Sequence, residues 1–116
     1  MKLAPTLTKS DLCLKTVHRY DFGKDKWQRL PSLLNPRSHH ASCAIGSSLY
    51  VFCGSRGKSG NTTDSIEKLI NANSNKISAI RWQEIQVSCK FTVRERPIVS
   101  TLNDREIVII GGYSQW

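Results

Sequence analysis

The residues of this sequence that could carry chemistry begin with a glycine-rich loop at positions 54–59, which ends in Gly-Lys-Ser as a phosphate-binding loop does. That motif also needs a glycine five positions before Gly57, where Phe52 stands. It must open a helix whose N-terminus faces the phosphate, whereas this loop leads into a strand-like run. The sequence therefore argues against nucleotide binding.

The histidines and cysteines are the residues that could bind a metal ion. They are His18, His39, His40, Cys13, Cys43, Cys53 and Cys89. Zinc ligands usually come in close pairs such as CxxC or HxxxH, and no such pair occurs. We therefore expect no metal site. We interpret the cysteines as small buried hydrophobes, His40 as a packed residue of an interior strand and His39 as a residue at the rim of the fold.

Nucleophilic and acid–base catalysis have no better candidates. Cys43 and Cys53 fall on runs that the pattern buries, where a thiol is not activated. The carboxylates fall on turns or outer strands with no evident partner. They are Asp21, Asp25, Glu67, Glu84, Glu95, Asp104 and Glu106. We therefore expect no catalytic residue, no cofactor and no enzymatic activity.

The charge balance is basic, because 17 Lys and Arg against 9 Asp and Glu give a formal net charge of +8. Such a charge could favour an anionic partner, but the basic residues are scattered and no nucleic-acid-binding signature accompanies them. No window approaches the roughly 20 apolar residues of a membrane span, and the N-terminus lacks the apolar core of a signal peptide. We expect a cytoplasmic protein with no membrane partner and with reduced cysteines.

Short strands separated by turns are the elements that must position these residues. Runs rich in β-branched, aromatic and aliphatic residues predict strands. They lie at 13–21, 27–30, 37–45, 49–53, 65–70, 81–85, 98–102 and 106–112. The turn at 46–48 predicts a hairpin between two of these runs, and no segment has a convincing helical period. The sequence therefore predicts an all-β fold.

One apolar run occurs twice. Residues 49–54 return 58 positions later as residues 107–112, and the run that begins at Trp27 is echoed by residues 81–85 at an offset of 55. Each copy of the apolar run is stopped by glycine, which lets the chain turn where a side chain would clash. A period of roughly 55 to 59 residues built from strands is typical of a propeller blade.

The recurring marks resemble kelch repeats, in which an Arg precedes a His and small residues, an aliphatic strand ends in a diglycine, and a Tyr precedes a Trp. The matching residues are Tyr20, Trp27, Arg37, His40, Tyr50, Gly54, Trp82, Arg96 (or Arg94), Gly111 and Gly112. The resemblance covers residues 13–116. Two departures, Cys53 for the first glycine and Leu69 for the tyrosine, mark the complete repeat as degenerate.

The resemblance implies kelch-type β-propeller blades of four antiparallel strands in an incomplete ring. Residues 1–12 would be a lead-in that could be disordered, 13–35 the end of a first blade, 36–93 a complete blade and 94–116 the start of a further one. Because a closed ring typically needs four to eight blades, we interpret the chain as a fragment. Its open blade edges would make it self-associate, aggregate or fold poorly when expressed alone.

The resemblance also implies a protein–protein interaction module, a scaffold that serves as the substrate-recognition part of an adaptor. In kelch propellers, partner contacts come from residues just after the blade-entry Arg and just after the diglycine. The residues matching these positions or lying beside them are Ser38, His39, Ser55, Arg56, Lys58 and Tyr113. Arg56 and Lys58 would suit an acidic segment of a protein partner.

Two alternatives belong to other classes of function. The first is a propeller-fold enzyme such as a galactose-oxidase-like oxidase, although the metal ligands of such enzymes have no visible counterpart in this sequence. The second is electrostatic binding to nucleic acid, which would weaken steeply with salt. Only the net charge favours it.

Overall fold

The computed structural model describes residues 13–55, 63–87 and 95–113, and the statements below concern those residues. The strands are β1 (Val17–Asp21), β2 (Lys26–Leu30), β3 (Ala41–Ile45), β4 (Ser48–Phe52), β5 (Ile66–Ile70), β6 (Arg81–Ile85), β7 (Ile98–Thr101) and β8 (Ile107–Ile110). A 3-10 turn, η2 (Ile77–Ala79), precedes β6. Every strand pair is antiparallel, which confirms the predicted all-β fold. None of the described segments forms a helix long and apolar enough to cross a membrane.

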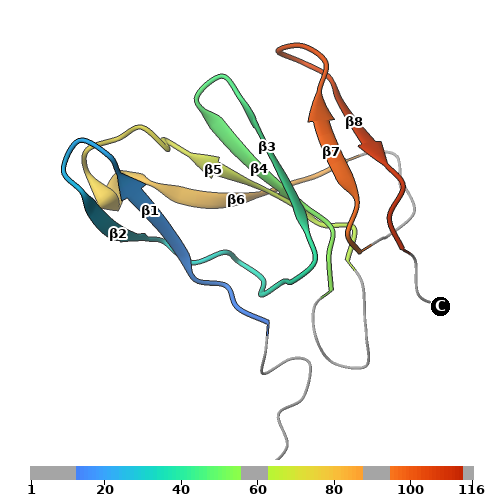
Figure 1. The fold of residues 1–116 in the computed structure, drawn as a ribbon, viewed down its shortest axis with the longest axis horizontal. Helices are drawn as coiled ribbons and strands as arrows, with labels where there is room; N and C mark the ends of the chain where they lie inside the picture. Colours follow the sequence, from blue (N-terminus) through green and yellow to red (C-terminus); the bar gives the residue numbers. More distant parts are fainter. Residues whose placement is uncertain (1–12, 56–62, 88–94, 114–116) are drawn as a thin grey trace, which may run out of the picture.

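The strands form a central sheet with a two-stranded ribbon on each side (Figure 1). The central sheet has the order β3-β4-β5-β6, and the ribbons are β1–β2 and β7–β8. The predicted bounds of β6 agree with the structure, and those of β4 and β8 differ by one or two residues. The predicted runs that begin at 13 and 37 start later as strands, because Leu14 and Arg37 instead form an isolated bridge with each other.

One face of the central sheet is covered by the β1–β2 ribbon. The buried cluster between them consists of Leu30, Leu33, Val51, Leu69, Ile80 and Trp82, with Val17, Leu49, Ala72 and Ile77 at its margin. Burying one such large side chain stabilises the fold by roughly 1.5–3 kcal/mol. This cluster therefore fixes the ribbon against the sheet.

The opposite face of the central sheet is covered by the β7–β8 ribbon. The second cluster consists of Phe52, Cys53 and Ile66, with Cys43, Tyr50, Ile85, Val99, Ile107 and Ile109 packed against it. Successive side chains of a strand point to opposite faces, so Val51 enters the first cluster and Phe52 the second. Burial on both faces explains why β4 is a nearly continuous apolar run.

The backbone repeats with the period of the sequence. His39 and Arg96, 57 residues apart, have φ of 54° and 55°. The pair Cys53 and Gly54 has φ of 61° and 98°, and the pair Gly111 and Gly112, 58 residues later, has 62° and 102°. The β7–β8 ribbon is therefore equivalent to β3–β4.

The β1–β2 ribbon is in turn equivalent to β5–β6. Tyr20 lies directly opposite Trp27 in the first ribbon, and Leu69 lies directly opposite Trp82 in the central sheet. Leu69 thus occupies the position in the central sheet that Tyr20 occupies in the first ribbon. The two ribbons correspond to the two different halves of the central sheet.

The repeat also corrects the assignment of one predicted motif residue. Arg96 has the backbone conformation of His39, not of Arg37, and both His39 and Arg96 follow a residue held in an isolated bridge. The residue equivalent to Arg37 is therefore the alternative, Arg94, which lies outside the described residues.

Candidate functional site

The candidate site is built on a buried ion pair that links β5 to the segment before β3. Arg37 Nη2 donates to Glu67 Oε2 at 2.6 Å, and both side chains are 0% exposed. Arg37 Nη1 donates to the carbonyl oxygens of Cys53 and Ser65 at 3.0 and 3.1 Å, and Nη2 also reaches Ser65 Oγ at 2.7 Å. The guanidinium thus satisfies backbone carbonyls at the end of β4 and just before β5.

Glu67 is the residue of this candidate site that the sequence did not predict, because it was expected on an outer strand without a partner. Its carboxylate accepts the backbone N–H of Leu34 at 2.6 Å and that of Asn35 at 3.3 Å, besides the Arg37 bond. A carboxylate in a buried apolar strand needs a cation and hydrogen-bond donors. The sequence does contain one indication that Glu67 is buried. Glu67 lies two residues before Leu69 and therefore on the same face of β5.

Above the buried ion pair, the candidate site includes a rim of residues at one end of the sheets. At this end β3 and β7 begin and β4 and β8 end (Figure 1). We define the rim as Ser38, His39, Ser55, Glu95, Arg96 and Tyr113. Ser38 and Ser55 exchange two backbone hydrogen bonds, and Glu95 and Tyr113 do the same one repeat later. These two bridges hold the rim residues on rigid backbone.

The contact between His39 and Arg96 joins the two repeats at the rim. The Arg96 N–H donates to the His39 carbonyl at 2.6 Å, and Arg96 Nη2 lies 3.2 Å from His39 Nε2. A guanidinium can only donate, so His39 Nε2 is the acceptor in this contact. The other ring nitrogen, Nδ1, lies 3.8 Å from Glu95 Oε2. The rim therefore orders a cation and an imidazole over a mostly buried carboxylate.

The structure brings together four of the six residues predicted to contact a partner. His39 is exposed, Tyr113 is 58% exposed and Ser38 is partly exposed. Ser55 is a correction: its residue is 0% exposed, since the turn at the positive-φ pair before it directs the chain inward to Ser38. Arg56 and Lys58 lie outside the described residues.

The two tryptophans of the motif have contrasting environments. Trp82 is 6% exposed, and its Nε1 donates to the Pro31 carbonyl at 2.9 Å, so it fills the space between the β1–β2 ribbon and the central sheet. Trp27 is 71% exposed and touches Tyr20, with 5.1 Å between ring centroids. Tyr50 faces the second cluster. The equivalent tryptophans differ because only Trp82 has a ribbon over it.

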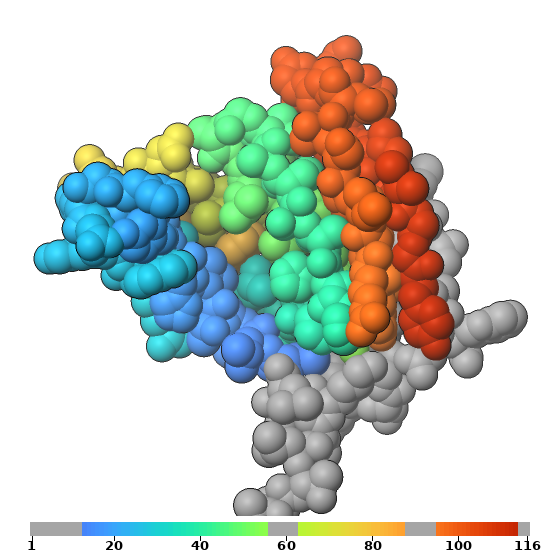
Figure 2. All heavy atoms as spheres, viewed as in Figure 1, coloured from blue at the N-terminus to red at the C-terminus, as the bar shows by residue number. Residues whose placement is uncertain are grey.

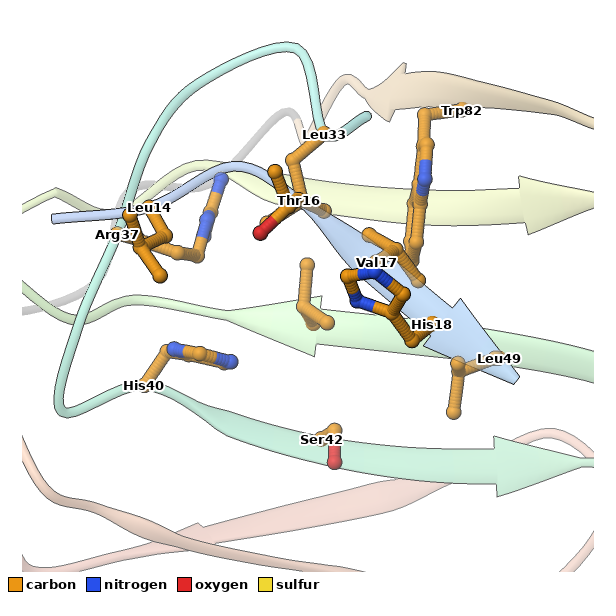
Figure 3. Close-up of a pocket in the computed structure, with 11 residues that line it drawn as sticks. Leu14, Thr16, Val17, His18, Leu33, Arg37, His40, Ser42, Leu49 and Trp82 are labelled. Atoms are coloured by element: carbon orange, nitrogen blue, oxygen red, sulfur yellow. The ribbon is translucent and has the colours of Figure 1, made fainter. Parts of the chain in front are cut away.

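A hollow of about 340 Å³ lies between β1 and the β3–β4 hairpin (Figures 2 and 3). Its lining includes Val17 and His18 from β1, and Ser42 and Leu49 from the hairpin. His40 points into it and is exposed there, which corrects the prediction that His40 is packed. Partial burial lowers the pKa of His40, and the electrostatic effects of Arg37 and then of His39 lower it further.

Of the four cysteines, Cys13, Cys43 and Cys53 lie within the described residues and Cys89 lies outside them. Cys13 and Cys53 are buried and Cys43 is partly buried, and burial raises the pKa of the Cys43 thiol. Across the described ranges, no three His, Cys, Asp or Glu side chains lie close enough to hold a metal ion.

The sequence matches no model of a known protein family, and no curated protein matches it.

Proposed function

We propose that this chain is a protein–protein interaction module, part of a kelch-type β-propeller that presents its rim to a protein partner. The propeller assignment is supported by the four-stranded antiparallel sheet, by the face-to-face stacking of ribbons on both of its faces and by the repeated backbone conformation. Trp82 between two layers and the positive-φ pair at the end of β4 support it further.

The observation that carries the functional proposal is the His39–Arg96 contact. It joins two consecutive repeats at one end of the sheets, where both residues are exposed. Function usually lies in loops held by a rigid scaffold, and the backbone bridges of Ser38 and Glu95 supply the rigidity. The exposed Arg96 guanidinium suits a carboxylate, because its planar fork can bind one bidentately.

An acidic peptide segment is therefore the partner chemistry that the rim fits. Tyr113, whose backbone pairs with that of Glu95, adds an exposed aromatic ring to the rim, and Tyr and Arg are enriched among residues that dominate binding at interfaces. Arg56 and Lys58 follow Ser55 in the chain and add basic charge to the same sequence region.

The test is a display screen of acidic peptides against the 116-residue chain, followed by measured dissociation constants. Arg96→Glu is expected to weaken selected peptides at least tenfold. Arg105→Glu is the matched control, since it makes the same charge change in the turn at the other end of the β7–β8 ribbon, and it should stay within twofold. Equal losses in both variants would indicate non-specific electrostatics, and an absence of binders would overturn the proposal.

A further inference from the structure

The two ribbons are complementary halves of one four-stranded unit. The β7–β8 ribbon is equivalent to β3–β4, and the β1–β2 ribbon is equivalent to β5–β6, as the backbone angles and the residues opposite the two tryptophans indicate. In the central sheet these halves are joined by β4 pairing with β5. In the described structure the equivalent edges are open, since β8 pairs only with β7 and β1 only with β2.

The two open edges cannot meet within one copy of the chain. The β1–β2 ribbon covers one face of the central sheet and β7–β8 covers the other, so the sheet stands between them (Figure 1). An open strand edge presents unpaired N–H and C=O groups that are ready to pair with another chain.

We propose that copies of this chain assemble head to tail, with β8 of one copy pairing antiparallel to β1 of the next. The pairing completes a sheet of the order seen in β3-β4-β5-β6. The register follows from that of the central sheet, where Leu49 lies opposite Leu69 and Phe52 opposite Ile66. It sets Ile107 opposite Tyr20 of the next copy and Ile110 opposite Val17.

The backbone hydrogen-bonding groups are arranged for this register. The Leu102 N–H donates to the Glu106 carbonyl at 2.9 Å, and bonds to a given neighbour alternate along an antiparallel strand. The N–H groups of Ile107 and Ile109 therefore point away from β7, toward the open edge. The N–H groups of β4 alternate in the same way. At its end, the Cys53 N–H points to the carbonyl of Ser65, which directly precedes β5.

The hollow beside β1 has the position that the incoming ribbon would fill. It lies between β1 and β3–β4, and its lining residues Ser42 and Leu49 are equivalent to Val99 and Ile107 (Figure 3). Those two residues pack against the sheet that precedes them. The same packing by Ser42 and Leu49 requires a ribbon over them, and within the described structure that space is open.

The outer face of the β7–β8 ribbon carries three apolar side chains beside the hydroxyl of Ser100. Ile98 and Ile110 lie directly opposite each other and are 65% and 53% exposed, and Val108 lies on the same face. Contiguous exposed apolar surface marks an interaction site. Paired with the next copy, this face would cover the hollow.

The assembly closes into a ring of a few copies. Each copy contributes two complete sheets, its central sheet and the sheet shared with a neighbour. A head-to-tail contact forms a ring if its rotation closes, and propellers typically have four to eight blades. Two to four copies are therefore expected. This number rests on the proposed propeller, whereas the β8–β1 pairing does not.

Disulfide cross-linking tests the register. By the phase described above, Arg19 and Val108 form a pair without mutual hydrogen bonds, in which the Cβ atoms approach most closely. Arg19→Cys in one tagged copy and Val108→Cys in a second should give a disulfide linking the two tags under mild oxidation. Ser100→Cys replaces Val108→Cys as the control, because Ser100 lies opposite Val108 but on β7. With the Ser100→Cys copy we expect at least fivefold less cross-linked product than with the Val108→Cys copy. Both yields are taken after subtraction of the product that the natural cysteines form. Equal yields would overturn the proposed register.

A proline at the open edge of β1 tests the pairing by a second route. His18 is exposed, and by equivalence with Glu67 its N–H points away from β2, so proline there removes only an edge donor. His18→Pro should give a monomer in sedimentation velocity with unchanged far-UV circular dichroism. The unsubstituted chain and His18→Ala should give one species of two to four copies. A monomeric or polydisperse unsubstituted chain would overturn the assembly, whatever the outcome of peptide binding at the rim.

Discussion

Arg37 and Glu67 form a 2.6 Å ion pair in which neither side chain has any exposed surface. The pair joins two segments 30 residues apart, and the same carboxylate accepts the Leu34 and Asn35 amides. Desolvating two charges is costly, and only good geometry and additional hydrogen bonds offset that cost. These bonds explain why a carboxylate is tolerated inside the sheet. The pair also fixes the backbone beneath the rim, because Arg37 directly precedes Ser38.

Breaking this pair from one side should be strongly destabilising. Arg37→Met leaves the Glu67 carboxylate buried without its cation, and we expect a loss of about 3–5 kcal/mol in the free energy of unfolding. Chemical denaturation measures it. The double variant Arg37→Met/Glu67→Leu removes both charges and should lose less than the sum of the two single variants. Additive losses would show that the two side chains do not stabilise each other.

The strands could be predicted from sequence because the core of the fold lies on both faces of one sheet. Residues 49–52 are almost continuously apolar since alternate side chains enter different clusters, and this pattern is visible without a structure. The hairpin through Gly46 was equally visible, because a short polar turn separates two apolar runs.

The site was less predictable because its residues are far apart in the chain. Glu67 has the composition of an outer-strand residue until Arg37 is known to lie beside it. Arg94 and Arg96 both precede Pro97, and only the backbone angle equates Arg96 with His39. Ser55 follows the turn residues as a contact residue should, but the turn carries it inward. These outcomes depend on backbone direction at single residues, which composition does not encode.

Gly54 should be irreplaceable, whereas Gly46 should not. A Cβ on Gly54 would lie 2.5 Å from the Ser38 carbonyl oxygen and 2.9 Å from His40 Cβ, at φ +98°. The steric clash and the unfavourable φ together predict a loss of roughly 2–5 kcal/mol for Gly54→Ala. Gly46→Ala, at φ +58° with nothing within 4 Å, should cost about 1 kcal/mol. Similar urea midpoints for the two variants would contradict this difference.

Stability should depend on pH through His40. Its pKa is lowered from the ordinary value of 6.5, first by partial burial and then by Arg37 and His39, so the unfolded chain binds the proton more tightly than the folded one. The neutral imidazole thus contributes stability that is present above pH 6.5 and is lost as the pH falls through the folded-state pKa. Acidification below pH 6.5 should lower the urea midpoint of both variants. The decrease should be smaller in His40→Gln than in the control His18→Gln, because only the control keeps His40. Parallel profiles would exclude His40 as the cause.

Trp82 and Trp27 provide a final matched pair, since they occupy equivalent positions in successive repeats but only Trp82 is covered. Trp82→Phe removes the bond to the Pro31 carbonyl and leaves a void between ribbon and sheet. A loss of roughly 1–3 kcal/mol is expected from the unsatisfied carbonyl and the lost packing. In the monomeric His18→Pro chain, Trp27→Phe should cost less than about 0.5 kcal/mol, because the Trp27 ring of a single copy is largely in solvent. Unfolding of that chain followed by circular dichroism measures both losses, and a larger loss from Trp27→Phe than from Trp82→Phe would contradict the contrast between the two tryptophans.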